Sequence, residues 1–542
     1  MRTPRLRLNP SNNRRALLAL LLALLAAGGP ARAAEVRVNT QAVRPPAEPP
    51  ALDIKAGKVQ LSVDQAIEIA LRQNLDLVVQ RYVRTQQRLS IVQSLGIYDL
   101  VGSVNVLDSS AAFPNVSQVN GSKSETQSGG FSFTQALPIG GNVILGYNNA
   151  KTDNNSPFRS AATLYNNGFN LTYNQPLLQG FGRLATERGI LIARNNSDVG
   201  RQQFNLQVTA TIQQVENAYW NLVQAKDQLN VAEESLGLAK ELHERNRIQV
   251  EVGTMAPLEL VQSEAAIATR EGTIIGAQAA VGNAEDALRR LLNVPSGTLW
   301  ETPIEPTTRP ETERIAINVD DALKTAYDSR PELRTQDLQL ALAKLNSEYF
   351  RNLLKPSLGL QVQYGYNGID TAFSDAFSQV TGLKFNTWQA SLVLAYPIQN
   401  RSARAQSASA NLDVDRFKLL YESEKTVVST EVRTAARGVV TAAKQIDAAR
   451  KSTEYQEKNL DAERKRYENG MSTSFNITQI QDQLTQARSI QVQAIVGYRT
   501  ALAEYYRAIG KLPAQDGVTI DDPDDPSLNR FSLRRDKLPG EN

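Results

Sequence analysis

The sequence of 542 residues contains few side chains of the kinds that catalyse reactions or bind metals. It has a single histidine, His243, and no cysteine. A histidine could serve as a general base or as a zinc ligand, but both tasks need partner histidines, carboxylates or thiolates at a fixed spacing. His243 falls on an apolar helical stripe with no such partner beside it. We interpret it as a packing residue and expect neither an enzyme nor a cofactor or metal site.

Two short motifs could instead bind an anion or a cation. Gly180-Phe181-Gly182-Arg183 has the glycines of a phosphate-binding loop but lacks its lysine and its dinucleotide-binding spacing. Four aspartates within residues 521–525 could gather around calcium, yet they do not have the spacing of an EF-hand loop. We interpret the first motif as a turn between a strand and a helix, and the second as part of a polar, solvated tail over residues 514–542. The net charge of +3 indicates no nucleic-acid partner.

The chain around these residues is a tandem duplication. Residues 225–292 resemble residues 442–509 without a gap, through a turn in the middle of each stretch. A second resemblance joins the segments that begin at Leu61 and Ile317. Two copies of one long unit suggest pseudosymmetric walls that enclose a space. We predict a first repeat over residues 59–300, a linker over residues 301–316 and a second repeat over residues 317–513.

Each repeat is expected to consist mainly of unusually long helices. Small and large apolar residues recur with a period of 3.5 over residues 218–250 and 435–467, which is typical of supercoiled helices. Residues 186–250 contain no proline and predict a rod of about 100 Å. Two shorter helices, over residues 62–95 and 258–292, together match its length. The same arrangement is expected in the second repeat over residues 403–468, 319–351 and 475–509.

Between the helices the apolar period changes to 2, which is the period of a β-strand. Leu360, Val362 and Tyr364, for example, alternate with Gln361 and Gln363. Charge on the lipid face of a β-barrel costs roughly 2–4 kcal/mol at mid-bilayer, so charge-free strands favour a barrel; a soluble sandwich with tyrosine-rich edges is the alternative. Although 21% of the chain is charged, no charged residue occurs in residues 129–150, 161–182, 356–369 and 385–400.

The N-terminus predicts export from the cytoplasm. Arginines precede an apolar run over residues 16–27, and Ala31-Arg32-Ala33 offers a small-x-small cleavage site. We predict a signal peptide over residues 1–33 and a Pro-rich extended leader over residues 34–58. No later apolar run reaches the length of a transmembrane helix.

These features together resemble the TolC family of outer-membrane efflux proteins. The residues that carry the resemblance are the turn Arg466-Tyr467-x-x-Gly470 and the opening Val63-Asp64-x-Ala66-Ile67, beside the duplicated hairpins and strand pairs. The resemblance covers residues 61–513. It implies an α+β membrane protein in which a trimeric outer-membrane β-barrel continues into a long periplasmic α-helical coiled-coil barrel, with two tandem repeats in each chain.

The function implied by the resemblance is a passive exit duct of a tripartite efflux or type I secretion system. The implied partners are two further copies of the chain, outer-membrane lipid, a periplasmic adaptor and an inner-membrane transporter of the RND or ABC type. The exported substrate is not indicated, although one histidine, no cysteine and three methionines disfavour a dedicated copper path. A structural coiled-coil envelope protein without a channel is the alternative, but it leaves the strand pairs unexplained. A secreted enzyme would need a constellation of catalytic residues that we do not find.

The number of strands departs from the family pattern. Members usually contribute two strands per repeat, whereas residues 99–175 have room and pattern for four. A trimer then has 12 strands in the usual form, or 18 if every strand joins the wall. We expect 12, with the additional hairpin partly outside the ring or forming a long external loop.

The resemblance also assigns roles at the periplasmic tip. Glu259 and Tyr467 match positions that link neighbouring hairpins, and Ser472 stands where the family has a cation. Asn476 and Gln479 are neutral at positions that can form acidic rings, and Asp482 lies one helical turn beyond Gln479. We predict a tip closed by neutral hydrogen bonds and packing; alternatively, Asn476 and Gln479 are solvated residues without a gating role. Adaptor docking is expected at the hairpin tips, at Gly253, Thr254, Met255, Leu258, Gly470, Met471 and Phe475.

A tip without acidic rings should be less sensitive to pH and to divalent cations than a tip closed by rings of aspartate. We expect weak block of single-channel current by Mg²⁺ or Ca²⁺ added on the periplasmic side, because neutral amides bind these ions less well than carboxylates do. Strong block that Asn476→Ala alone abolishes would contradict this expectation.

Overall fold

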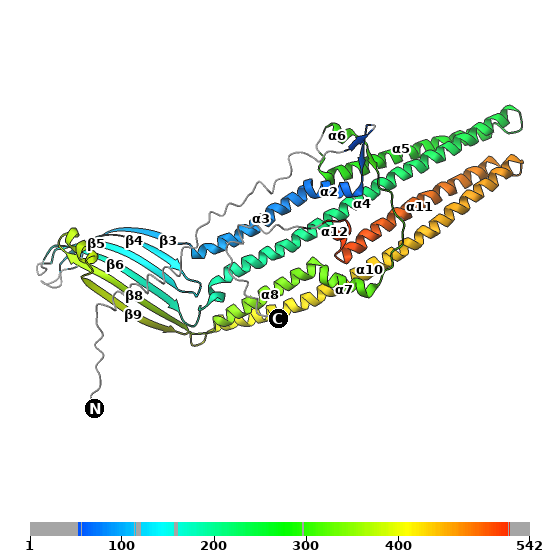
Figure 1. Ribbon diagram of the computed structural model, residues 1–542. Helices are drawn as coiled ribbons and strands as arrows, with labels where there is room; N and C mark the ends of the chain where they lie inside the picture. The colour runs from blue at the N-terminus through cyan, green and yellow to red at the C-terminus, as the bar shows by residue number, and fades with distance from the viewer. Residues whose placement is uncertain are drawn as a thin grey trace.

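The molecule is elongated, with a β-sheet at one end and long helices that run away from it (Figure 1). The predicted signal peptide, nearly all of the predicted leader and the aspartates of residues 521–525 lie outside the described residues. This computed structural model describes residues 53–55, 57–112, 114, 121–156, 161–294, 297–518 and 520.

Two helices of almost equal length form the frame of the rod. They are α4 (Arg183–Glu251), with 69 residues, and α10 (Arg401–Glu468), with 68 residues. Each is about 100 Å long at about 1.5 Å per residue. The predicted stripe of period 3.5 is buried along α10, for example at Val439, Ala442 and Ile446. Both predicted long helices are thereby confirmed.

Shorter helices pack along each long helix, as predicted. α3 (Leu75–Leu95) and α5 (Leu258–Leu292) both contact α4, while α8 (Pro331–Asn352) and α11 (Ser474–Ala508) both contact α10. α4 also contacts α8 and α11, so the two repeats lie side by side. In the described part of the chain, no helix combines the length and the apolar character needed to cross a membrane.

The first short helix of each repeat is broken, contrary to the single helices predicted over residues 62–95 and 319–351. Asn74 leaves the helical conformation with ψ at 124°, and its side chain caps the helix that follows. In the second repeat the break falls at Arg330, where Pro331 starts a new helix because proline fits the first turn but not the interior. The segments before the two breaks are α2 (Val63–Gln73) and α7 (Val319–Ser329).

Six antiparallel strands form one continuous sheet in the order β3-β4-β5-β6-β8-β9. β6 of the first repeat pairs with β8 of the second, with Phe169 opposite Tyr366, so the repeats share the sheet. The strands are β3 (Val101–Ala112), β4 (Lys123–Ala136), β5 (Asn142–Asn154), β6 (Thr163–Pro176), β8 (Ser357–Asp370) and β9 (Phe385–Ala395).

The additional hairpin of the first repeat is part of this sheet. β3 and β4 pair from Val101 opposite Thr134 to Ala112 opposite Lys123, and β4 pairs equally fully with β5. The expectation of a long external loop is therefore wrong, because the backbone groups of β4 find partners on both sides within the sheet.

The turns that lead from the sheet into the long helices lie where the sequence predicted them. Residues 177–182 connect β6 to α4, and residues 396–400 connect β9 to α10. Gly180-Phe181-Gly182-Arg183 is thus a turn, as predicted. One element was not predicted: α9 (Phe373–Thr381), a short helix between β8 and β9 that contacts β6 and β8.

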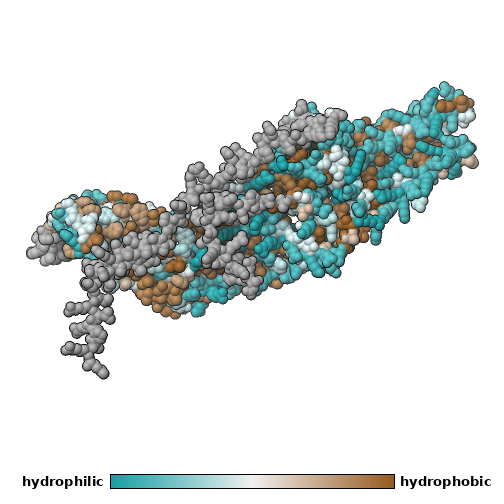
Figure 2. Space-filling view, in the orientation of Figure 1, coloured by the Kyte–Doolittle hydropathy of each residue, from teal (hydrophilic) through white to brown (hydrophobic). Residues whose placement is uncertain are grey.

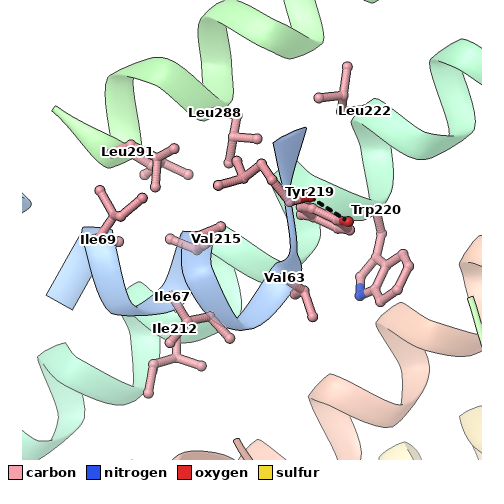
Figure 3. Close-up of a cluster of buried hydrophobic side chains, with 14 of the residues drawn as sticks. Val63, Ile67, Ile69, Ile212, Val215, Tyr219, Trp220, Leu222, Leu288 and Leu291 are labelled. Carbon is pink, nitrogen blue, oxygen red and sulfur yellow. Dashed lines mark hydrogen bonds between the residues drawn. The ribbon is translucent and has the colours of Figure 1, made fainter. Parts of the chain in front are cut away.

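An apolar core lies where the short helices meet near the middle of the rod (Figure 3). Val63 and Ile67 from α2, Val215 and Tyr219 from α4, and Leu288 from α5 are all buried. The Tyr219 hydroxyl donates to the Leu61 carbonyl oxygen at 3.1 Å. A small sheet closes one side of this core and is built from β1 (Asp53–Lys55), β2 (Lys58–Leu61) and β7 (Ile304–Pro306). The short helix α12 (Leu512–Gln515) contacts α4 and adds Leu512 to the core.

A buried and a half-buried acidic side chain, Glu216 and Asp516, lie at the edge of the core. Glu216 on α4 is 6% exposed, and its Oε2 atom, like Oδ2 of Asp516, has no hydrogen-bond partner among the described residues. Burial, and next the charge of Asp516, raise the pKa of Glu216 to about 8, although Arg499 opposes the shift. Burial, and next Asp64, raise the pKa of Asp516 to about 6. The folded protein therefore favours the protonated form of both groups.

These shifts predict that the protein becomes less stable as the pH rises. A glutamate in the unfolded chain has a pKa of 4.5, whereas Glu216 in the folded protein has a pKa of about 8. Protonated Glu216 therefore contributes its full stabilisation below pH 4.5, and this contribution is lost as the pH rises to about 8. Glu216→Gln should remove part of this loss, on the order of 1.4 kcal/mol for each unit of pKa shift. Thermal unfolding of the detergent-solubilised protein between pH 5 and 8 measures the effect.

Glu233→Gln is the matched control, because Glu233 is an exposed residue of the same helix. The control should follow the wild type at every pH. If the stability of Glu216→Gln depends on pH in the same way as that of the wild type, Glu216 does not contribute to the loss of stability at high pH.

Candidate functional site

The two helical hairpins turn at the end of the rod that lies farthest from the sheet (Figure 1). The turns have the same construction: Thr254 N–H donates to the Gln249 carbonyl oxygen at 2.9 Å, and Met471 N–H donates to that of Arg466 at 2.8 Å. Gly253 and Gly470 occupy the left-handed region, with φ of 80° and 71°, where a residue with a Cβ is strained. The turn glycines identified in the sequence are thus required by the backbone.

A polar contact joins the two hairpins just before these turns. Tyr467 of α10 is buried, and its hydroxyl donates to Asn246 Oδ1 at 2.6 Å and to Gln249 Oε1 at 3.1 Å, both on α4. Burial, and next the charge of Glu259, raise the pKa of Tyr467. Ser474 in turn donates a hydrogen bond to Glu259 across the same interface. Tyr467 and Glu259 therefore both link one repeat to the other.

Ser472, Asn476 and Gln479 do not make such links. Ser472 bonds to Glu463 of its own hairpin, and Asn476 Nδ2 donates to Ser472 Oγ at 3.4 Å. Gln479 is exposed. Glu463, a buried acidic residue that our sequence analysis did not select, also pairs with Arg466 at 3.1 Å. These residues order the second hairpin internally.

Asp482 forms a link that the sequence did not reveal. Its Oδ1 atom lies 2.7 Å from Nη2 of Arg270, which comes from α5 of the other repeat and is 7% exposed. The Arg270 Nε also donates to Ser235 Oγ at 3.0 Å, and Thr485 Oγ1 lies at 3.0 Å from the same oxygen. Three helices thus meet at one buried guanidinium, beside a groove of about 440 Å³.

His243 lies between the arms of the first hairpin. Its Nδ1 atom is 2.8 Å from Ser263 Oγ on α5, and the ring is half-buried. Among the described residues there is no cluster of three or more histidine, aspartate or glutamate side chains placed to hold a metal ion. The position of His243 fits the packing role that we expected.

The docking residues named from the sequence lie at the outermost ends of the hairpins. Leu258, Met471 and Phe475 are each more than 60% exposed. Val252 in the first turn is exposed to a similar extent. Figure 2 shows apolar atoms at the tip of the α4–α5 hairpin, surrounded by polar surface. Each tip thus presents a small apolar patch.

The sheet has one apolar and one polar face. The register aligns Phe133, Leu145, Leu171, Tyr364 and Trp388 in one row across β4 to β9, on the same face. The opposite face carries uncharged polar residues and small residues in the middle of the strands. Examples across five strands are Ser132, Asn148, Asn170, Thr172, Gln363 and Thr387.

The sequence profile of the outer membrane efflux protein family matches residues 141–294 and 322–511, which is more than half of the chain. The chain belongs to this family. It is therefore an outer-membrane protein of the efflux type rather than an enzyme, as expected. The resemblance stated from the turn at Tyr467 and the duplicated hairpins is confirmed.

Individual relatives of this efflux protein are distant. The pyoverdine export outer membrane protein OpmQ of Pseudomonas putida is 23% identical over 298 residues, which span 55% of the chain and 61% of OpmQ. The chain thus matches less than two thirds of this relative's length.

Solved structures of outer membrane channels share the fold, and two of them serve as examples. The Campylobacter jejuni CmeC outer membrane channel has 15% identity and a TM-score of 0.61, over 83% of this chain and 86% of CmeC. The open state of the Neisseria gonorrhoeae MtrE outer membrane channel has 17% identity and a TM-score of 0.59, over 86% of this chain and 98% of MtrE.

Removal of the Tyr467 hydroxyl should loosen the tip of this efflux protein. In Tyr467→Phe, Asn246 Oδ1 loses its buried partner, which costs about 1–3 kcal/mol. Amide hydrogen exchange should therefore become faster in residues 246–259 and 463–476, and remain unchanged near the sheet. Tyr455→Phe is the control, because Tyr455 is 65% exposed on the same helix. Unchanged exchange at the tip in Tyr467→Phe would show that this bond does not hold the hairpins together.

Proposed function

We propose that the chain forms one third of a passive exit duct that carries substrates across the periplasm and the outer membrane. The observation that carries the proposal is the sheet, which has one apolar face, one uncharged polar face and two free edges, and which leads directly into helices about 100 Å long. In a barrel of three chains the apolar face meets lipid and the polar face lines the lumen. A lumen without mid-strand charges would let substrates of either sign pass.

The free edges support closure with neighbouring chains. β3 and β9 are the two ends of the strand order, so each has one neighbour within the described chain. Unpaired backbone groups are not tolerated in the hydrocarbon region, so an outer-membrane sheet must close. Pairing of β9 with β3 of the next chain completes a ring of three identical sheets.

All six strands join the wall in this proposal, which gives 18 strands. With strands about 4.8 Å apart and tilted by about 40°, the ring is about 36 Å across, compared with about 24 Å for 12 strands. The wider ring has room for a larger aqueous lumen, and the resting closure then lies at the opposite end of the duct.

The hairpin tips provide that closure. Tyr467 and Glu259 hold the two hairpins of one chain together through hydrogen bonds, and the ion pair of Arg270 with Asp482 joins them as well. The apolar patches at Leu258, Met471 and Phe475 are the surfaces on which a periplasmic adaptor would dock. An inner-membrane transporter of the RND or ABC type would supply the energy and select the cargo.

Disulfide crosslinking tests the arrangement of the wall, because the chain has no native cysteine. Ser103→Cys on β3, combined with either Thr387→Cys or Ser391→Cys on β9, should give covalent dimers and trimers on a non-reducing gel. All three positions point to the polar face, so a disulfide does not disturb the lipid contact.

The matched alternative combines Asn148→Cys on β5 with the same β9 cysteines. β5 is an inner strand of the sheet and should not crosslink to another chain. Crosslinks from β5 but not from β3 would indicate a ring of 12 strands. No crosslinks from either strand, together with monomers by light scattering, would favour a coiled-coil scaffold without a channel.

A further inference from the structure

The helix α9 interrupts the connection between β8 and β9 and lies directly on the sheet. Gly368 of β8 contacts its backbone so closely that a Cβ there would collide with the Ala376 carbonyl oxygen. Asn167 of β6 is fully buried and donates a hydrogen bond from Nδ2 to the Phe373 carbonyl oxygen at 3.5 Å. Ala376 and Val380 are buried against the strands. α9 is thus a fixed part of the wall.

The helix covers the apolar face of the sheet and not the polar one. Tyr147 lies opposite Phe169, and Phe169 lies opposite Tyr366, so these three side chains share the apolar face. The residues two positions farther along the same face are Asn149, Asn167 and Gly368, and α9 is seated on Asn167 and Gly368. The Tyr147 hydroxyl also donates to Asn167 Oδ1 at 3.0 Å beneath the helix.

α9 replaces the polar strand surface with aromatic surface. Phe373 and Phe377 remain 44% and 41% exposed, and their rings stack with centroids 5.8 Å apart. The ring of Phe377 also packs edge-on against Tyr147, with ring centroids 6.1 Å apart, and Phe373 packs in the same way against Tyr165, with centroids 6.3 Å apart. The aromatic patch is therefore continuous with the apolar face of the strands.

Charged residues begin just beyond this patch. Lys151 and Asp153 lie on the same face of β5 as Tyr147, two and three side-chain rows farther out, and form an ion pair of 2.8 Å. Asp370, at the end of β8, accepts a hydrogen bond from Gln379 of α9 at 2.9 Å. α9 thus lies on the boundary between the apolar band and a charged rim.

The height of the apolar band explains why a helix is useful here. On β5 the outward apolar residues run from Val143 to Tyr147, which gives about 10 Å along the membrane normal for a strand tilted by about 40°. A lipid-facing band in the outer membrane is about 25 Å tall. A helix is about 10 Å in diameter, so α9, seated on β6 and β8, extends the apolar surface beyond Phe169 and Tyr366 by up to about that height.

We propose that α9 is an interfacial helix on the outside of the barrel, and that acyl chains of the outer-leaflet lipid cover Phe373 and Phe377. The inference rests on the proposed barrel, in which the apolar face meets lipid. Aromatic side chains favour the membrane interface, and Asp375 is the only charged residue in α9. The aromatic patch of α9 is continuous with the apolar face of the strands, which meets lipid in the proposed barrel. Lipid, and not a second protein, is therefore expected to cover Phe373 and Phe377.

Site-directed spin labelling tests this assignment, because a cysteine-free chain accepts single labels at chosen positions. The protein is reconstituted in vesicles of phosphatidylethanolamine and phosphatidylglycerol with a nitroxide on Phe377→Cys. We expect the label to collide more often with apolar oxygen than with a water-soluble nickel chelate. Phe373→Cys is the second reporter if Phe377→Cys does not assemble.

Two adjacent residues of β9 provide matched controls. Trp388 on the apolar face is 73% exposed, and Thr387 is exposed on the polar face. Trp388→Cys should report lipid and Thr387→Cys should report water.

The outcomes separate the inference from the function on which it rests. A water-exposed label at Phe377, with the two controls as expected, overturns the lipid contact of α9 and leaves the barrel intact. If the label at Phe377 collides with neither oxygen nor the nickel chelate, protein covers the helix, and this result also overturns the inference. A Trp388 label that reports water overturns the proposed barrel, and the inference falls with it.

Discussion

A β-strand needs partners for its backbone N–H and C=O groups, and the architecture of this chain depends on how its two repeats supply them to each other. The first and second repeats meet in the pairing of β6 with β8. This pairing places the start of α4 beside the end of α8, because both adjoin the same end of the sheet. The side-by-side arrangement of the repeats then continues along α4 and α11 as far as the tips. The hydrogen bond between Tyr467 and Asn246 thus depends on the pairing of β6 with β8 at the other end of the molecule.

Much of this fold can be predicted from the sequence because its signals are periodic and long. Residues such as Val439, Ala442 and Ile446 repeat at 3.5-residue spacing over many turns, and charge-free alternation identifies the strands. Local breaks are harder to predict. Asn74 interrupts a helix through one side chain that competes for backbone N–H groups, and the apolar pattern on either side does not record it. α9 was missed because nine residues provide too few turns for a periodic signal.

The candidate site divides in the same way. Tyr467 and Glu259 could be selected from their places beside the turns, but their partners come from the other repeat and depend on how the repeats pack. Arg270 was missed although a signal exists: the comparison of the repeats aligns it with Ala487, a buried position of α11. A cation at an otherwise apolar seam position indicates a buried partner, here Asp482. Glu216 left no sequence signal, because its burial depends on the approach of α12 to α4.

The pairing of β6 with β8 also determines the order in which the molecule can form. Phe169 and Tyr366 lie opposite each other although a complete helical hairpin separates them in the chain, whereas the arms of the α4–α5 and α10–α11 hairpins are neighbours in sequence. Local contacts close faster than distant ones, because loop closure costs entropy before contacts compensate for it. The helical hairpins and the hairpins of consecutive strands are therefore favoured to form before β6 pairs with β8. Until β6 and β8 pair, each repeat ends in an additional open strand edge, and an open strand edge is a template for aggregation.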